Sequence, residues 1–168
     1  LPIGGVLATQ NEVIPYAVGV DIGCRMCLTV YDLPEKHMDR YQHKLKAGLM
    51  ENTAFGQGKE LENPMDDALF DRKEFSEIPF LKTLFKKARR QIGSSGSGNH
   101  FVEFGVVDLP AYDEVLGVPP GRYVAVLSHS GSRGLGANIA KRYTDIAMER
   151  CRLPREAKHL AWLDLNSE

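Results

Sequence analysis

The sequence predicts an α+β fold, with mixed sheet or sheets flanked by amphipathic helices. Runs of strand-forming residues and helical repeats of apolar residues both occur, and they do not alternate in a regular βαβ rhythm. With 168 residues, 43% of them hydrophobic and 26% charged, the chain is long enough to bury a core. We expect residues 1–168 to form a single partial domain, incomplete at both ends, because the chain starts without Met inside a patterned segment.

The first third of the chain predicts two strands and a helix. Residues 13–20 are almost wholly apolar and predict a buried strand, which Pro15 interrupts. Residues 26–31 are rich in strand formers and predict a second strand after a glycine-containing bend. An apolar repeat then predicts an amphipathic helix over residues 35–50. The apolar face of that helix consists of Met38, Tyr41, Leu45 and Leu49.

The middle of the chain predicts a loop over residues 52–64, a short helical piece over 65–72 and a longer helix over 80–92, which Gly93 ends. The apolar face of the longer helix contains Leu81, Leu84, Phe85, Ala88 and Ile92. Its remaining surface carries Lys82, Lys86, Lys87, Arg89 and Arg90. Such a basic surface fits a nucleic-acid backbone, although a solvated face is the commoner role.

The last third predicts strands over residues 99–107 and 123–127, with a turn over 117–121 between them. A helix follows over residues 137–151. We expect this helix to bury Ile139, Tyr143, Ile146 and Ala147.

Composition excludes some classes of function. The net charge of −1 gives no global basic field, so a nucleic-acid partner would need a local basic patch. No apolar run approaches the roughly 20 residues of a membrane span, and no signal peptide is recognisable at the start. The odd count of three cysteines argues for a reducing compartment. We therefore expect a cytoplasmic protein that does not associate with membranes.

Four side chains suggest a metal site. Asp21 and Cys24 lie three residues apart on the bend, while His100 opens one predicted strand and His129 ends another, each beside glycines. A mixture of carboxylate, thiolate and imidazole favours a transition metal such as Mn²⁺, Zn²⁺ or Fe²⁺ over Ca²⁺. The alternative is that Asp21 caps a turn, that Cys24 is an inert buried thiol and that both histidines are structural.

The C-x-x-C spacing of Cys24 and Cys27 does not by itself make a site. A structural zinc site needs a further cysteine or histidine pair, and none follows. A redox pair needs a strand-to-helix junction, whereas strand residues follow here. We therefore expect Cys27 to be a core residue. The other histidines, His37, His43 and His159, have no companions and are expected on the surface.

The glycine-rich loop over residues 93–98 is not a dinucleotide fingerprint, because a helix precedes it and a strand follows. Its N–H groups could bind an anion, or the loop could be a flexible connector. In a regular strand after it, Asn99, Phe101 and Glu103 would face one side and His100 the other. Arg133 suits a phosphate or carboxylate, or a surface ion pair.

The motifs together resemble those of the RtcB family of RNA-splicing ligases. They occur in the family's order over nearly the whole chain, at residues 2–6 (PIGGV), 19–24 (GVDIGC), 98–103 (GNHFVE) and 129–134 (HSGSRG). The resemblance implies a GTP- and Mn²⁺-dependent ligase that joins an RNA 3′-phosphate or 2′,3′-cyclic phosphate to a 5′-hydroxyl through a guanylylated histidine. Such a protein acts in tRNA splicing and RNA repair, and an archease-like activator is a possible partner.

The resemblance also implies residue roles. Asp21, Cys24, His100 and His129 resemble the family's metal ligands, with Cys24 bridging two Mn²⁺ ions. Asn99 resembles a phosphate contact of GTP, and the residues that resemble guanosine-side contacts are Phe101 and Glu103. Two ions of this kind would neutralise a triphosphate and stabilise an in-line displacement.

Some features depart from the family's pattern. Arg25 stands after the metal-binding cysteine, where the family often has glycine. None of the five histidines matches the nucleophile by motif, so we expect that residue beyond Glu168 and expect this chain alone to be inactive. Two other functions stay open: a metal-dependent phosphoesterase with water as nucleophile, and a catalytically inactive RNA-binding fragment.

Overall fold

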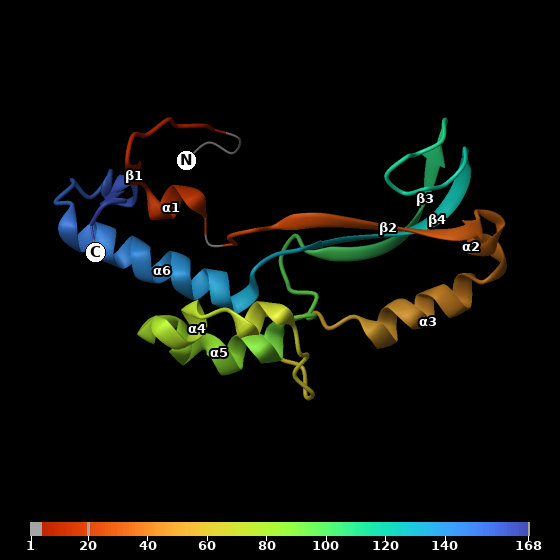
Figure 1. Cartoon of the computed structure of the whole chain (residues 1–168), viewed down its shortest axis with the longest axis horizontal. Helices are drawn as coiled ribbons and strands as arrows, with labels where there is room; N and C mark the ends of the chain where they lie inside the picture. The colour runs from red at the N-terminus through yellow and green to blue at the C-terminus, as the bar shows by residue number, and fades with distance from the viewer. Residues whose placement is uncertain (1–4, 20, 168) are drawn as a thin grey trace.

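The computed structural model describes residues 5–19 and 21–167, and their arrangement confirms the α+β prediction. A long sheet lies at one end of the molecule, and α6 (Arg133–Arg150) extends away from it toward both chain termini (Figure 1). The sheet contains β2 (Arg25–Pro34), β4 (Gly121–Ser130) and β3 (Phe101–Leu109), in the spatial order β2-β4-β3. Both pairings are antiparallel. The strands predicted over 26–31 and 123–127 are confirmed in longer form, and the one predicted over 99–107 is confirmed two residues later.

The register of this sheet places one candidate ligand near the end of its central strand, β4. His129, near the end of β4, pairs with Met26 of β2 on one side and with Phe101 of β3 on the other. Residues that are paired across antiparallel strands project to the same face. His129 and Phe101 therefore share a face, at the end of the sheet where the loops to the helices begin.

The predicted strand over residues 13–20 is wrong. Only β1 (Glu12–Val13) is a strand, and it pairs with β5 (Leu163–Asp164) near the other end of the chain. Pro15 then opens a short helix, α1 (Pro15–Val18). Proline suits the first helical position because its missing N–H would have no partner there anyway. Residue 20, which the prediction included, lies outside the described residues.

The predicted helix over residues 35–50 forms as two pieces, α2 (Lys36–Arg40) and α3 (Gln42–Asn52), with Tyr41 between them. Its expected apolar face is half-buried. The prediction for α6 is partly wrong: the helix starts at Arg133, and Tyr143 is 44% exposed. Ala147 is buried as expected, whereas Ile139 and Ile146 are half-buried.

The buried core lies between helices and not under the sheet. Phe70 of the 3₁₀ helix η1 (Ala68–Asp71), Phe75 of α4 (Glu74–Glu77) and Ala88 of α5 (Pro79–Gln91) form its centre. The rings of Phe70, Phe75 and Phe85 pack with centroids 5.6–5.7 Å apart. Partly buried residues around them are Leu81, Phe85, Ile92 and Leu135. The predictions of the helix over 80–92 and of the short helical piece before it are both confirmed.

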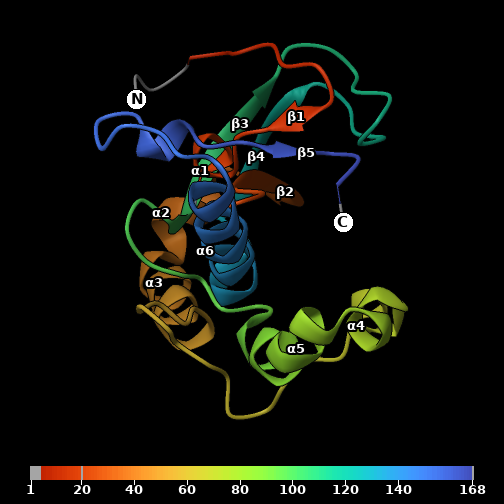
Figure 2. The same ribbon diagram turned by 90° about the vertical axis from the view of Figure 1, so that its left-hand side faces the viewer.

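The helix α6 connects the parts of the molecule. Seen along a perpendicular direction, it lies between the terminal segments and the pair α4 and α5 (Figure 2). A second 3₁₀ helix, η2 (Lys158–Leu160), belongs to the terminal segments and also contacts α6. The start of α6 therefore packs against α5, close to the end of β4, where His129 lies.

The sheet is only partly covered. Val124 and Ala125 in β4 are 1% and 2% exposed, but Met26 and Leu28 in the edge strand β2 are 54% and 48% exposed. Cys27 is also exposed, so its assignment to the core is wrong. A local pattern of strand formers does not say which other segments cover the strand. Among the described residues, no helix has the length and hydrophobicity to cross a membrane.

Candidate metal centre

The bend before β2 brings two candidate ligands to the same place. The backbone N–H of Cys24 donates a hydrogen bond to the carbonyl of Asp21 at 3.2 Å, which closes a tight turn. Gly23 occupies this turn with φ of 76°, a conformation that side-chain-bearing residues rarely adopt. A turn directs side chains three residues apart toward one centre, which a regular strand does not do.

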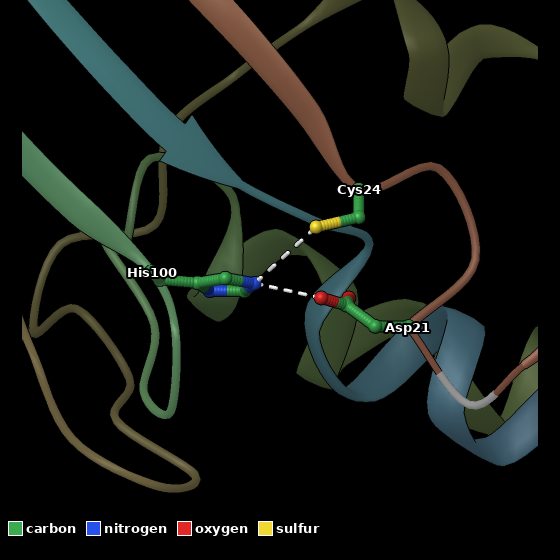
Figure 3. A group of neighbouring side chains, drawn as sticks. All are labelled: Asp21, Cys24 and His100. Carbon is green, nitrogen blue, oxygen red and sulfur yellow. Dashed lines mark hydrogen bonds and ion pairs between the residues drawn. The ribbon is translucent and has the colours of Figure 1, made fainter. Parts of the chain in front are cut away.

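Three side chains from distant segments converge there (Figure 3). Nε2 of His100 lies 2.6 Å from Oδ2 of Asp21 and 3.9 Å from Sγ of Cys24. One ligand atom from each residue lies within 4.8 Å of the others, so a single ion could reach all three. The side chain of His100 is only 3% exposed, whereas that of Asp21 is 35% exposed. The imidazole side of the centre is therefore buried, and the carboxylate side is open to solvent.

His129 joins the centre through Cys24. Its Nε2 lies 2.6 Å from Sγ of Cys24, and its ring centroid is 5.4 Å from that of His100. The thiol thus lies between two imidazoles, one from the loop before β3 and one from the end of β4. Three of the four residues singled out in the sequence lie within reach of one ion, and the fourth, His129, contacts this group through the Cys24 thiol.

The environment shifts the pKa values of two of these groups in opposite directions. Partial burial raises the pKa of Asp21, but hydrogen bonds from His100 and Cys24 and the charges of His100 and Arg133 outweigh it, so the pKa lies below the ordinary value. Desolvation raises the pKa of the Cys24 thiol, and the hydrogen bond and negative charge of Asp21 raise it further. Without metal, Asp21 is therefore a carboxylate beside a protonated thiol.

Arg133 supports the centre from behind. Its Nε donates to Oγ of Ser94 at 3.3 Å, and its Nη1 donates to Nδ1 of His100 at 3.3 Å. Since guanidinium has no acceptor, Nδ1 must accept this bond, and Nε2 carries the proton donated to Asp21. Sequence reasoning predicted that this residue suits an anion or an ion pair, and it missed the contact with His100. The backbone of Arg133 has φ of 53°, in the left-handed region that residues with side chains rarely adopt.

Two glycines make room for the ligands. A Cβ on Gly96 would overlap the ring of His100 and the guanidinium of Arg133, and one on Gly131 would overlap the carboxylate of Asp21. Ser95 and Gly96 are buried in the 93–98 loop, where the Gly96 carbonyl accepts a bond from the N–H of Gly56 at 2.8 Å. The middle of the loop, residues 94–96, is thus packed against its neighbours and supports His100.

The predicted nucleotide contacts lie beside the centre. Asn99 and Glu103 are exposed, and Phe101 is half-buried with its ring edge-on to His129 at 5.6 Å. His129 pairs with Phe101 across the strands and therefore projects to the same face of the sheet. The strand alternation begins only at Phe101, because His100 precedes β3. The nucleotide roles of these three residues stay predictions.

The donor set fits a transition metal. Carboxylate oxygen, imidazole nitrogen and thiolate sulfur together match borderline ions such as Mn²⁺, Fe²⁺ or Zn²⁺ better than Ca²⁺, which takes six or more oxygens. A thiolate between two imidazoles also suits a position shared by two ions. The residues present therefore fit the metal that the sequence motifs imply.

Comparison with known proteins gives a consistent result. The family model described as "tRNA-splicing ligase RtcB" matches residues 1–80 and 74–168. The RNA-splicing ligase RtcB of Escherichia coli K12 is 31% identical over 162 residues, which cover 88% of this chain and 36% of that protein. The tRNA-splicing ligase RtcB of Aeropyrum pernix is 31% identical over 186 residues, with 89% and 38% covered. The corresponding protein of Methanococcus maripaludis is 29% identical over 205 residues, with 99% and 42% covered.

The chain spans only 36% and 38% of the length of the relatives from Escherichia coli and Aeropyrum pernix. The similarity nevertheless extends over most of this chain, and it includes the segments that carry all four candidate ligands. On this evidence the chain belongs to the RtcB family.

Proposed function

We propose that this chain is the metal-binding part of an RNA ligase of the RtcB type. Such an enzyme would use GTP and Mn²⁺ to join RNA 3′-phosphate or 2′,3′-cyclic phosphate ends to 5′-hydroxyl ends, in tRNA splicing or RNA repair. The observation that supports this proposal best is the convergence of Asp21, Cys24 and His100 from distant segments, with His129 against the same thiol. The proposal places the protein in the cytoplasm, with RNA, GTP and possible archease-like activators as partners.

In this proposal each side chain has a physical task. The buried imidazole of His100, which Arg133 contacts at Nδ1 before a metal enters, fixes the position of the centre. Asp21 supplies a carboxylate from the open side, and Cys24 supplies sulfur between the two histidines. Bound cations would neutralise phosphate charge during in-line displacement at phosphorus. The Cys24 thiol must lose its proton before sulfur can act as a ligand.

The nucleotide would lie beside the centre. The Phe101 ring, next to His129, offers a flat apolar surface for the guanosine side. Glu103 is exposed two residues further along the same face of β3, where its carboxylate could accept hydrogen bonds from ribose or base. Asn99 is exposed in the turn before His100, within the loop that precedes the strand, and its amide suits a phosphate oxygen.

Manganese binding tests the proposal directly. We expect the 168-residue chain to bind Mn²⁺, measured as loss of the free-ion signal in electron paramagnetic resonance. The variants Asp21→Asn, Cys24→Ser and His100→Asn should each weaken binding by about tenfold or more. His43→Asn, which changes an exposed histidine in α3, is the matched control and should bind as the unchanged chain does.

The outcomes separate this proposal from the alternatives. Absence of Mn²⁺ binding, or equal binding by all variants, would contradict it. Release of nitrophenol from a nitrophenyl phosphodiester with Mn²⁺ and without GTP would assign the centre to a phosphoesterase. RNA binding that a chelator does not change would support an inactive RNA-binding fragment.

A further inference from the structure

One surface of the molecule has a strong positive charge that the metal centre does not use. The helix α5 carries five basic residues and no acidic residue. Arg89 and Arg90 are neutralised by Asp66 and Glu60, at 3.2 Å and 2.8 Å. The other three basic residues, Lys82, Lys86 and Lys87, are exposed, and no ion pair joins them to any of the described residues. The lysine charges are therefore available to an external anion.

Two of these lysines share one side of α5, and Lys87 lies further round the helix, toward α6. Lys82 and Lys86 are one turn apart on α5, so their side chains are neighbours. Beside the start of α5, the guanidinium of Arg142 in α6 lies over the ring of Phe80 at 4.6 Å. The helix has 13 residues and is therefore about 20 Å long, enough to follow several nucleotides of a single strand.

The C-terminal end of α5 lies beside the start of α6, next to the metal centre. The buried side chain of Gln91, at the end of α5, accepts the backbone N–H of Gly134 at 2.9 Å. Cε of Lys87 lies against the same glycine, since a Cβ built there would be 2.9 Å from it. Arg133, which precedes Gly134, donates a hydrogen bond to His100. The end of α5 that carries Lys87 thus lies next to the residues that support the metal centre in the function proposed above.

We propose that Lys82, Lys86 and Lys87, extended by Arg142, bind the phosphate backbone of a single RNA strand and direct its end to the metal centre. This inference rests on the proposed function for the identity of the strand. Point charges on flexible stems suit sequence-independent contacts with phosphate, and an open helix face admits a strand that has no fixed shape. Arg142 belongs to the surface because it is exposed and its guanidinium lies over the ring of Phe80 at the start of α5.

The test measures how RNA binding depends on salt. A fluorescent 12-nucleotide single-stranded RNA with a 3′-phosphate is titrated with the full chain and followed by anisotropy at several salt concentrations. The triple variant K82Q/K86Q/K87Q should bind more weakly at low salt, and its slope of log K against log salt should fall by about 2, at roughly 0.7 for each lost contact. The control K36Q/K44Q/K46Q removes three exposed lysines of α2 and α3 and should keep the slope. K82R/K86R/K87R keeps the charge and should restore binding.

Each result decides the inference. No RNA binding by the unchanged chain, or equal slopes for the α5 variant and the control, would overturn it. An aspartate-rich peptide that displaces RNA with the same lysine dependence would assign the surface to an acidic protein and would also overturn it. Mn²⁺ binding is measured in parallel and should not change in the α5 variant. If RNA binding depends on these lysines while the chain binds no Mn²⁺, the metal proposal fails and the surface stands.

Discussion

Replacement of Gly131 by alanine is expected to damage metal binding without unfolding the protein. The added Cβ would lie 2.6 Å from Cγ and 2.7 Å from Oδ2 of Asp21, where ordinary contact begins near 3.4 Å. The carboxylate must therefore retreat by about 0.8 Å or more. If the carboxylate moves away from His100 by that amount, the 2.6 Å contact becomes about 3.4 Å, longer than an ordinary N–H···O hydrogen bond. Because Gly131 is not among the residues with positive φ, alanine causes no backbone strain there.

The assay is Mn²⁺ binding together with urea unfolding. We expect affinity to fall by about 10- to 100-fold, or about 1.4–2.8 kcal/mol, as when a ligand's support is removed. Gly98→Ala is the matched control: its φ of 74° makes alanine strained, yet a Cβ there meets no atom within 4 Å. It should cost about 1–2 kcal/mol of stability and leave Mn²⁺ affinity unchanged. If Gly131→Ala binds Mn²⁺ with an affinity within twofold of that of the unchanged chain, the reasoning is refuted.

Four further predictions concern the Cys24 thiol, the Asp21 carboxylate, the nucleotide and the helix α3. Because Asp21 raises the pKa of Cys24, Asp21→Asn should lower it toward the ordinary value, seen as thiolate absorbance appearing at lower pH in a chain without its other cysteines. The pKa of Asp21 itself lies below 3.8, so its contribution to stability is present above that pH and is lost as pH falls through the lower folded-state value; acid unfolding of Asp21→Asn should lack this component. The chain incubated with Mn²⁺ and labelled GTP should not become stably labelled, and a labelled band would contradict the assignment of the nucleophile. Gly48→Ala should raise the free energy of unfolding by about 0.5–1 kcal/mol, since the helical site has space for a methyl group.

Local patterns predicted most of the elements, because strand formers and helical repeats act over short distances. The strands around Val102 and Val124 and the helix around Leu84 follow their patterns closely. The segment after Val13 failed because an apolar run does not distinguish a strand from a short helix, and Pro15 favours the helix start. The exposure of Cys27 was beyond local reasoning, since it depends on which segments cover an edge strand.

The candidate ligands were predictable because their residue types and glycine neighbours carry chemistry, whereas the support of the centre was not. The sequence around Arg133 does not show that its side chain contacts Ser94 and His100, because these contacts join segments that are more than 30 residues apart. The glycines could be read from the sequence, but the need for them became clear only in the structure. Gly96 and Gly131 are positions where a side chain would occupy the space of a ligand.

The hydrogen bonds of the metal-free centre have a consequence for how a metal enters. Arg133 donates to Nδ1 of His100, so the proton of the neutral ring sits on Nε2, the atom that faces Asp21 and Cys24. Nε2 can bind a cation only after it loses that proton, and Cys24 must also lose one. A neutral ring that binds metal through Nε2 carries its proton on Nδ1, where it would meet the guanidinium donor. Metal entry should therefore require the Arg133–His100 contact to change, so the support behind the centre is coupled to its occupancy.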